Sequence, residues 1–150
     1  MAKTVKQHGR VYTPDYLVKV ILDFGGYDKP NILKKHVIDN SCGDGAFLTE
    51  IVRRYCASFL TQKQDLSKLK HELETYIHGI ELDATECDKC ILNLNKVVEK
   101  YGISKVKWDI TNADTLTVDR FNARMDYVIG NPPYVRVHNL EDSYEIVKKF

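Results

Sequence analysis

Short apolar runs alternate along this chain with longer stretches in which apolar residues recur every three or four positions. The short runs are typical of buried strands and fall at residues 37–38, 77–80, 106–110 and 127–130. Helical periodicity follows the first two runs, at residues 47–55, 61–75 and 87–98. Strands that alternate with helices predict an α/β domain with a parallel sheet. We expect the strand order 3-2-1-4, with a switch point between the first and fourth strands.

The amino-terminal region predicts one helix. Thr13 can cap it, Pro14 suits its first turn, and Asp15 favours the positive end of its dipole. Gly25-Gly26 is expected to end it. The residues expected to face the core are Leu17, Val18, Ile21 and Phe24. Residues 1–10 are polar, and we expect them to be loosely ordered.

The fourth strand is followed by Asn131-Pro132-Pro133-Tyr134. Two prolines cannot continue a strand ladder, because they lack a donor and have a fixed φ. The chain must therefore break at the carboxyl end of that strand, the edge at which open α/β sheets bind ligands. An amide, rigid proline carbonyls and a flat phenol ring at that place can hold a planar amine or amide.

Polar groups also follow the other three strands. The first leads into Asp39 and a turn through Gly43 and Gly45, which lacks the G-x-G-x-x-G pattern of dinucleotide sites and carries a second acid, Asp44. Such an acidic turn suits a cationic ligand with an amine better than a pyrophosphate.

The second strand ends in Glu81, and Asp83 with Glu86 resembles a capping box. Because Asp83 takes the cap position, we interpret Glu81 as free to accept both hydroxyls of a ribose. Asp114 after the third strand can accept the amino group of an adenine, and Thr13-Pro14 can reach a ligand carboxylate. A ribose, an adenine and an amino acid together describe S-adenosylmethionine.

Composition limits the classes of function. The 150 residues make one domain, with 22 basic and 21 acidic residues and a net charge of +1, so the chain has no strong electrostatic footprint for nucleic acid. We find no signal peptide and no membrane span, and the four cysteines show no secreted framework, so a cytoplasmic protein is expected. Cys87-x-x-Cys90 lacks a second ligand pair, and no metal site is predicted.

In this order, the motifs resemble the N6-adenine DNA methyltransferases of restriction-modification systems in the circular order called gamma. Tyr12-Thr13-Pro14 is similar to the amino-terminal cofactor motif of that family. The following motifs are matched by residues 39–48, 79–83, 112–114 and 130–134. The first of these has Asn40 and Ser41 where the family usually has Pro and Ala or Thr.

The resemblance implies a role for each matching residue. Thr13 would contact the methionine carboxylate of S-adenosylmethionine, and the methionine amino end would be held by Asp39 with the backbone at Ser41 and Gly43. The ribose hydroxyls would bind Glu81, and the cofactor adenine would contact Leu82, Asp114 and the Thr115 backbone. The target adenine, flipped out of double-stranded DNA, would meet Asn131, Pro132 and Tyr134.

The resemblance also implies what a complete enzyme would need. The family's target-recognition domain follows its fourth motif, so we expect residues 1–150 to form a truncated catalytic domain that reads DNA through a missing or separate domain. A restriction nuclease, fused or separate, is a possible partner. Two alternatives stay open: a protein-glutamine or RNA amino-methyltransferase, and a non-catalytic cofactor-binding module that needs a partner for DNA recognition.

Overall fold

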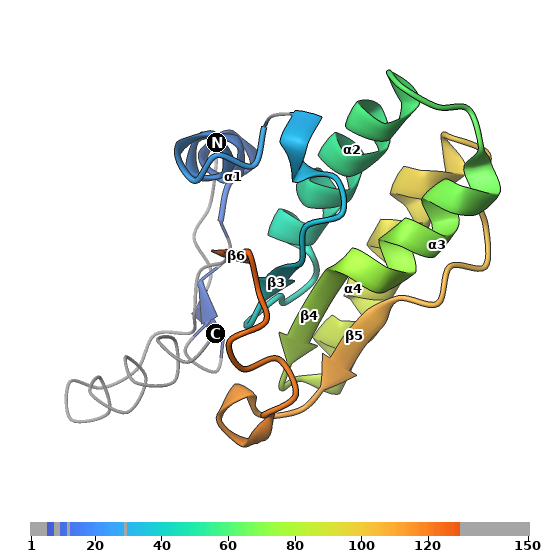
Figure 1. Cartoon of the computed structure of the whole chain (residues 1–150). Coiled ribbons are helices and arrows are strands. Elements are labelled where there is room, and N and C mark those ends of the chain that lie inside the picture. The colour runs from blue at the N-terminus through green and yellow to red at the C-terminus, as the bar shows by residue number, and fades with distance from the viewer. Residues whose placement is uncertain (1–5, 8–9, 12, 29, 130–150) are drawn as a thin grey trace.

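A four-stranded parallel sheet forms the centre of the computed structural model, which describes residues 6–7, 10–11, 13–28 and 30–129 (Figure 1). The spatial order is β5-β4-β3-β6, which confirms the expected order 3-2-1-4. Neighbouring strands pair in register, with Val37 opposite both Ile77 and Tyr127, and His78 opposite Asp109. The strands are β3 (Val37–Asp39), β4 (Ile77–Glu81), β5 (Asp109–Asn112) and β6 (Tyr127–Ile129).

Helices cover one face of this sheet (Figure 1). They are α2 (Ala46–Leu60), α3 (Leu66–Tyr76) and α4 (Ala84–Glu99). Since successive side chains of a strand point to opposite faces, Val37 and Ile77 enter the large cluster with these helices. Ile38 and Ile80 point the other way, where Phe121 covers them in a second, smaller cluster.

The third strand begins later than predicted. The apolar run at 106–110 suggested a strand there, but β5 spans Asp109–Asn112. The backbone N–H of Lys107 donates to Glu74 Oε2 of α3 at 2.9 Å, so this part of the run bonds to a helix side chain. The ladder starts only where Asp109 comes to lie opposite His78.

The amino-terminal helix α1 (Asp15–Phe24) has its predicted span but a different buried side. Pro14, not Thr13, occupies the cap position, and its carbonyl accepts the N–H groups of Leu17 and Val18. The predicted stripe is wrong except for Val18, which is buried together with Leu22. Phe24 is 96% exposed, and the outer side also carries Tyr16, Leu17, Val20 and Ile21.

Arg54 of α2 holds the end of α1 in place. Its guanidinium donates to Asp23 Oδ1 at 2.7 Å, to the Tyr27 carbonyl at 3.1 Å and to Glu50 Oε2 at 2.9 Å. Its neighbour Arg53 also bonds to Glu50 but has a half-exposed side chain. Arg54 therefore fixes α1 against α2, and α1 in turn positions Thr13 at its start.

The remaining described elements are short. Residues 1–10 were expected to be loose, but β1 (Lys6–Gln7) and β2 (Arg10–Val11) form an antiparallel pair. Two 3₁₀ turns, η1 (Pro30–Ile32) and η2 (Thr115–Thr117), lie in the connections. Within the described part of the chain, no helix is long and apolar enough to cross a membrane. The expected helix at 141–150 lies outside the described residues.

Candidate functional site

The carboxyl ends of the strands bring the predicted cofactor residues to one edge of the sheet. Parallel pairing places Asp39 beside Gly79, and Glu81 beside Asn112. The arrows of β4 and β5 point toward the η2 turn in Figure 1, which marks this edge. The turns after β3, β4 and β5 therefore lie next to one another, as the sequence predicts for a ligand site.

Glu81 joins two of these turns. Its side chain is buried, with the residue 1% exposed, and Oε1 accepts the Gly43 N–H while Oε2 accepts the Asp83 N–H, both at 2.8 Å. The interpretation of Glu81 as a free acid is therefore wrong, because a carboxylate buried this deeply needs hydrogen-bond donors.

Asp83 is the cap of α4, as predicted. Its Oδ1 accepts the N–H groups of Thr85 at 2.9 Å and Glu86 at 3.2 Å. The reciprocal half of a capping box differs from expectation, since the Asp83 N–H donates to Glu81 instead of Glu86. The same carboxylate of Glu81 thus supports both the turn after β3 and the start of α4.

Asp39 lies beneath the turn that follows β3. The residue is 1% exposed, and Oδ1 accepts the Ser41 N–H at 3.0 Å. Burial raises the pKa of Asp39 to about 7, with a smaller contribution from Glu81 and an opposing one from the Ser41 hydrogen bond. Since the N–H groups of Ser41 and Gly43 both donate within the protein, the carbonyls of this turn are the backbone groups suited to an ammonium ligand.

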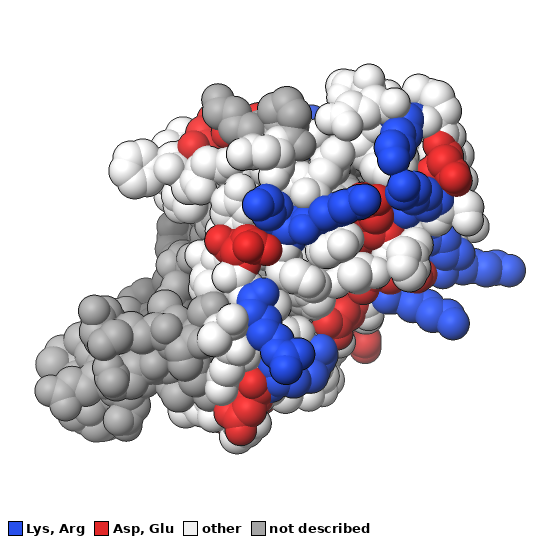
Figure 2. Space-filling model, in the orientation of Figure 1, with Lys and Arg blue, Asp and Glu red and all other residues white. Residues whose placement is uncertain are grey.

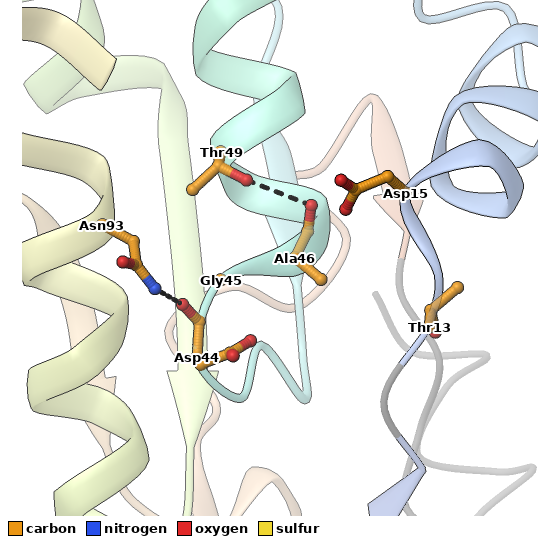
Figure 3. A pocket seen from close by; sticks show the side chains of 7 residues that line it. All are labelled: Thr13, Asp15, Asp44, Gly45, Ala46, Thr49 and Asn93. Atoms are coloured by element: carbon orange, nitrogen blue, oxygen red, sulfur yellow. Dashed lines mark hydrogen bonds between the residues drawn. The ribbon is translucent and has the colours of Figure 1, made fainter. Parts of the chain in front are cut away.

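A cavity of about 340 Å³ opens between the start of α1 and the start of α2 (Figure 3). Figure 3 shows the carboxylates of Asp15 and Asp44 pointing toward the space between these two helices. Burial and Glu86 raise the pKa of Asp44, while Lys89 opposes the shift. Two acids at one cavity favour a cationic ligand group. The lining residues are Thr13, Asp15, Asp44, Gly45, Ala46, Thr49 and Asn93.

Helix α4 supports the turn at this cavity. Asn93 Nδ2 donates to the Asp44 carbonyl at 2.9 Å (Figure 3). Gly45 has a φ of 99°, and a Cβ added there would lie 3.0 Å from Cys90 Sγ. Glycine at this position therefore allows both the left-handed turn and the close approach of α4.

Sequence reasoning identified Thr13 and noted Asp44 as an acid in the turn, but it missed Asp15, Thr49 and Asn93 as lining residues. Asn93 lies 49 residues from Asp44 on a regular helix, and no local pattern marks it.

The turns after β4 and β5 form the other side of the site. Leu82, predicted to contact the cofactor adenine, is 69% exposed. Asn112 Nδ2 donates to the carbonyls of Glu81 and Leu82, both at 2.9 Å, and Thr115 Oγ1 donates to the Asn40 carbonyl at 2.6 Å. Asp114 is exposed and caps η2. These bonds tie the turns together and leave Leu82 and Asp114 at the surface, where a ligand can reach them.

Two further predictions concern residues elsewhere. Asn131, Pro132 and Tyr134 lie outside the described residues, although β6 ends two positions before Asn131. Among the residues that the structure describes, no group of three metal-binding side chains comes together.

The sheet order and the turns at its carboxyl edge give the chain an α/β fold that is also found in solved methyltransferase subunits. The type I restriction-modification system methyltransferase subunit from Streptococcus thermophilus has the same fold, with a TM-score of 0.53 and 20% identity over 87% of this chain and 26% of that one. The ATP-dependent Type ISP restriction-modification enzyme LlaBIII bound to DNA is also similar, with a TM-score of 0.56 and 14% identity over 93% of this chain and 9% of that one.

The chain belongs to the N-6 DNA Methylase family, whose sequence profile matches residues 1–149. It is 37% identical to the Type II methyltransferase M.BstVI of Geobacillus stearothermophilus over 97% of this chain and 27% of that protein. The chain thus spans about a quarter of the length of this curated relative.

Proposed function

We propose that the polypeptide carrying this chain is a site-specific DNA methyltransferase of a restriction-modification system. It transfers a methyl group from S-adenosylmethionine to the N6 amino group of adenine. Family membership and the 37% identity to a Type II methyltransferase support this activity.

The observation that carries the proposal is the pairing of β3 with β6. Asp39, at the end of β3, lies opposite Ile129, at the end of β6. The acidic turn follows the first strand, and Asn131-Pro132-Pro133-Tyr134 follows the second. Since β3 and β6 are parallel neighbours, both strands end at the same edge of the sheet, and Asn131 follows β6 in the sequence by two positions. A methyl donor and an amine acceptor must be adjacent in this way.

The charge of the site supports S-adenosylmethionine as the cofactor. When bound, it supplies a methyl group activated by a sulfonium, and its methionine end carries an ammonium. Asp39 lies beneath the turn, while Asp15 and Asp44 line the cavity. Three carboxylates around one turn fit a ligand with positive charge and disfavour a pyrophosphate.

We assign the cofactor contacts to these turns. Thr13 contacts the methionine carboxylate, and the ammonium binds the carbonyls of Ser41 and Gly43 above Asp39. The ribose hydroxyls bind at Glu81, where β4 ends. The exposed Leu82 contacts the adenine ring. Asp114 and the Thr115 backbone recognise its edge.

Asn131 and Pro132 act on the target base. The amino nitrogen of adenine is a poor nucleophile, because its lone pair is delocalised into the ring. Two acceptors, the Asn131 side chain and the Pro132 carbonyl, favour a pyramidal nitrogen and stabilise its growing positive charge. The C–N bond forms as the C–S bond breaks, the electron pair remains on sulfur, and one N6 proton leaves to water. Tyr134 stacks on the flipped base.

DNA sequence is read elsewhere in this proposal. Lys and Arg side chains are interspersed with Asp and Glu on the face shown in Figure 2, and the net charge is only +1. Strong duplex binding needs a cluster of basic residues. Relatives several times longer than this chain have room for a recognition domain. We therefore infer that a further domain or a partner subunit contacts the DNA and that a nuclease, fused or separate, completes the system.

The test is nucleoside mass spectrometry of DNA from a host without adenine methylation that expresses the open reading frame containing this chain. N6-methyladenine is the expected product, and Asn131→Ala should abolish it while cofactor affinity stays within about threefold, because Asn131 contacts only the target base. Unmethylated DNA from a polypeptide that binds cofactor would overturn the DNA substrate and favour a protein or RNA nitrogen.

A further inference from the structure

His36 and Asp126 join β3 to β6 at the amino ends of these strands, the end of the sheet opposite to the candidate site. His36 precedes β3, and Asp126 precedes β6. The His36 N–H donates to Asp126 Oδ2 at 2.8 Å, and the His36 carbonyl accepts the N–H groups of Asp126 at 2.9 Å and Tyr127 at 3.0 Å. We call these three hydrogen bonds the His36–Asp126 clasp. It connects residues 90 positions apart in the sequence.

The side chain of His36 anchors the clasp to the rest of the sheet. His36 Nδ1 lies 2.9 Å from His78 Nε2 in β4, and His78 Nδ1 lies 2.6 Å from Asp109 Oδ2 in β5. Arg120 Nη2 donates to Asp109 Oδ1 at 2.8 Å. Although burial acts to raise it, the pKa of Asp109 is lowered to about 2 by hydrogen bonds from His78 and Arg120. Asp109 is therefore a carboxylate that accepts from its neighbours.

The negative charge of Asp109 sets the direction of the hydrogen bond between His78 and Asp109. Because Asp109 accepts, His78 Nδ1 must donate, and in a neutral His78 the remaining Nε2 can only accept. In that tautomer His36 Nδ1 donates to His78 Nε2, and in either direction the two rings are joined by a hydrogen bond. The ring of His36 contacts His78 of β4, and its backbone bonds to Asp126 and Tyr127 at the start of β6. His36 therefore links β3 to both neighbouring strands.

The ladder that positions β6 is otherwise short. β6 contains three residues, and within the described chain it pairs only with β3. A slip of one residue would move its end by about 3.3 Å and turn its side chains to the other face. Reacting atoms must meet within about 3–3.5 Å. The register of β6 on β3 thus decides whether the residues that follow can reach a methyl group bound at the turn after β3.

We propose that Asp126 and His36 are positioning residues for methyl transfer, since their clasp sets the register of β6 against the cofactor-binding strand. This inference rests on the proposed function. It predicts that Asp126 affects the rate of the chemical step and leaves cofactor binding unchanged, because the clasp lies at the edge of the sheet opposite to the cofactor turn.

The test compares Asp126→Ala, Asp126→Asn and the control Asp88→Asn in the active polypeptide. Single-turnover methyl transfer should slow about 10- to 100-fold in Asp126→Ala, while the cofactor Kd stays within about twofold. Asp126→Asn should recover most of the rate, because its side-chain oxygen still accepts the His36 N–H. Asp88 is an exposed acid on α4, and its replacement should leave the rate unchanged.

A second readout does not depend on activity. Amide hydrogen exchange at residues 126–129 should be about tenfold faster in Asp126→Ala than in the wild type, because the clasp no longer restrains local opening. An unchanged rate in Asp126→Ala would overturn the positioning role, and so would a lower rate accompanied by weaker cofactor binding and faster exchange at all strands.

A wild-type polypeptide that leaves DNA unmethylated would instead overturn the proposed function and, with it, the assignment of the clasp to methyl transfer. Unchanged exchange at residues 126–129 in Asp126→Ala would overturn the clasp whatever the polypeptide does to DNA.

Discussion

Glu81 Oε1 accepts the backbone N–H of Gly43 at 2.8 Å, across 38 positions of the sequence. The bond joins the turn after β3 to the end of β4, and the second oxygen of the same carboxylate holds the start of α4. One buried side chain therefore shapes the turn on which the cofactor assignment depends.

Replacing Glu81 should accordingly affect both folding and binding. Glu81→Ala leaves two backbone N–H groups without their acceptor, each at a cost of about 1–3 kcal/mol. We expect a loss of at least about 2 kcal/mol in the free energy of unfolding, measured with urea, and weaker cofactor binding by titration calorimetry. Glu81→Gln keeps one acceptor oxygen and should lie between the two proteins. Full stability in Glu81→Ala would show that water replaces the carboxylate.

The close contact of Gly45 with α4 gives a second prediction. Gly45→Ala combines a left-handed backbone with a Cβ placed 3.0 Å from Cys90 Sγ, whereas Gly26→Ala has a similar φ of 82° and nothing within 4 Å. Gly26→Ala should cost only the backbone term, about 1–2 kcal/mol. Gly45→Ala should cost more and reduce cofactor affinity. Equal losses of stability in the two variants would mean that α4 shifts away from the added Cβ at no measurable cost in free energy.

Adjacent arginines of α2 provide a matched test of how α1 is held. Arg54→Ala removes the bonds to Asp23 and to the Tyr27 carbonyl, for an expected loss of about 2 kcal/mol. Because α1 positions Thr13 and Asp15 at the cavity, cofactor affinity should decline too. Arg53→Ala should cost less than about 1 kcal/mol, since this side chain is half exposed and, among the described residues, its hydrogen bonds go to Glu50 of the same helix. Thermal unfolding and cofactor titration measure both effects, and equal results for Arg54→Ala and Arg53→Ala would contradict the role assigned to Arg54.

Asp39 should make stability depend on pH. Its pKa is raised from 3.8 to about 7 by burial, so the folded state binds the proton more tightly than the unfolded state. The stabilisation is complete below pH 4 and is lost as pH rises toward 7. Asp39→Asn keeps an acceptor for the Ser41 N–H and removes the titration. Its free energy of unfolding relative to wild type should improve by up to about 4 kcal/mol from pH 4 to pH 8. If the difference in the free energy of unfolding between Asp39→Asn and the wild type does not change with pH, the pKa of Asp39 is not raised in the folded protein.

Local patterns in the sequence predicted much of this architecture. The alternation of apolar runs with helical periods was sufficient for the order β5-β4-β3-β6, because parallel strands joined by helices have few allowed arrangements. Asp83 was recognised as a cap because its bonds reach only two and three residues ahead. Such features are encoded within a short stretch of chain.

Features that depend on distant partners were not predictable in this way. Val18 and Leu22 face α2, while Leu17, Ile21 and Phe24 have the same local pattern and remain at the surface. The start of β5 depends on Glu74 of α3, and the partners of Glu81 include an amide 38 positions away. Asn93 became part of the candidate site only when α4 packed beside the turn after β3. The assigned roles of the site residues stay predictions.

The pairing of β3 with β6 also has a consequence for biosynthesis. The partners of β3 differ greatly in their distance along the chain: Val37 pairs with Ile77 and also with Tyr127. A ribosome therefore delivers β3, α2, β4 and α4 well before β6, and contacts between nearby segments form fastest. The acidic turn can take shape on the nascent chain while its partner strand is still being made. Of the four described strands of this sheet, β6 is then the last to join, and the His36–Asp126 clasp forms only at that stage.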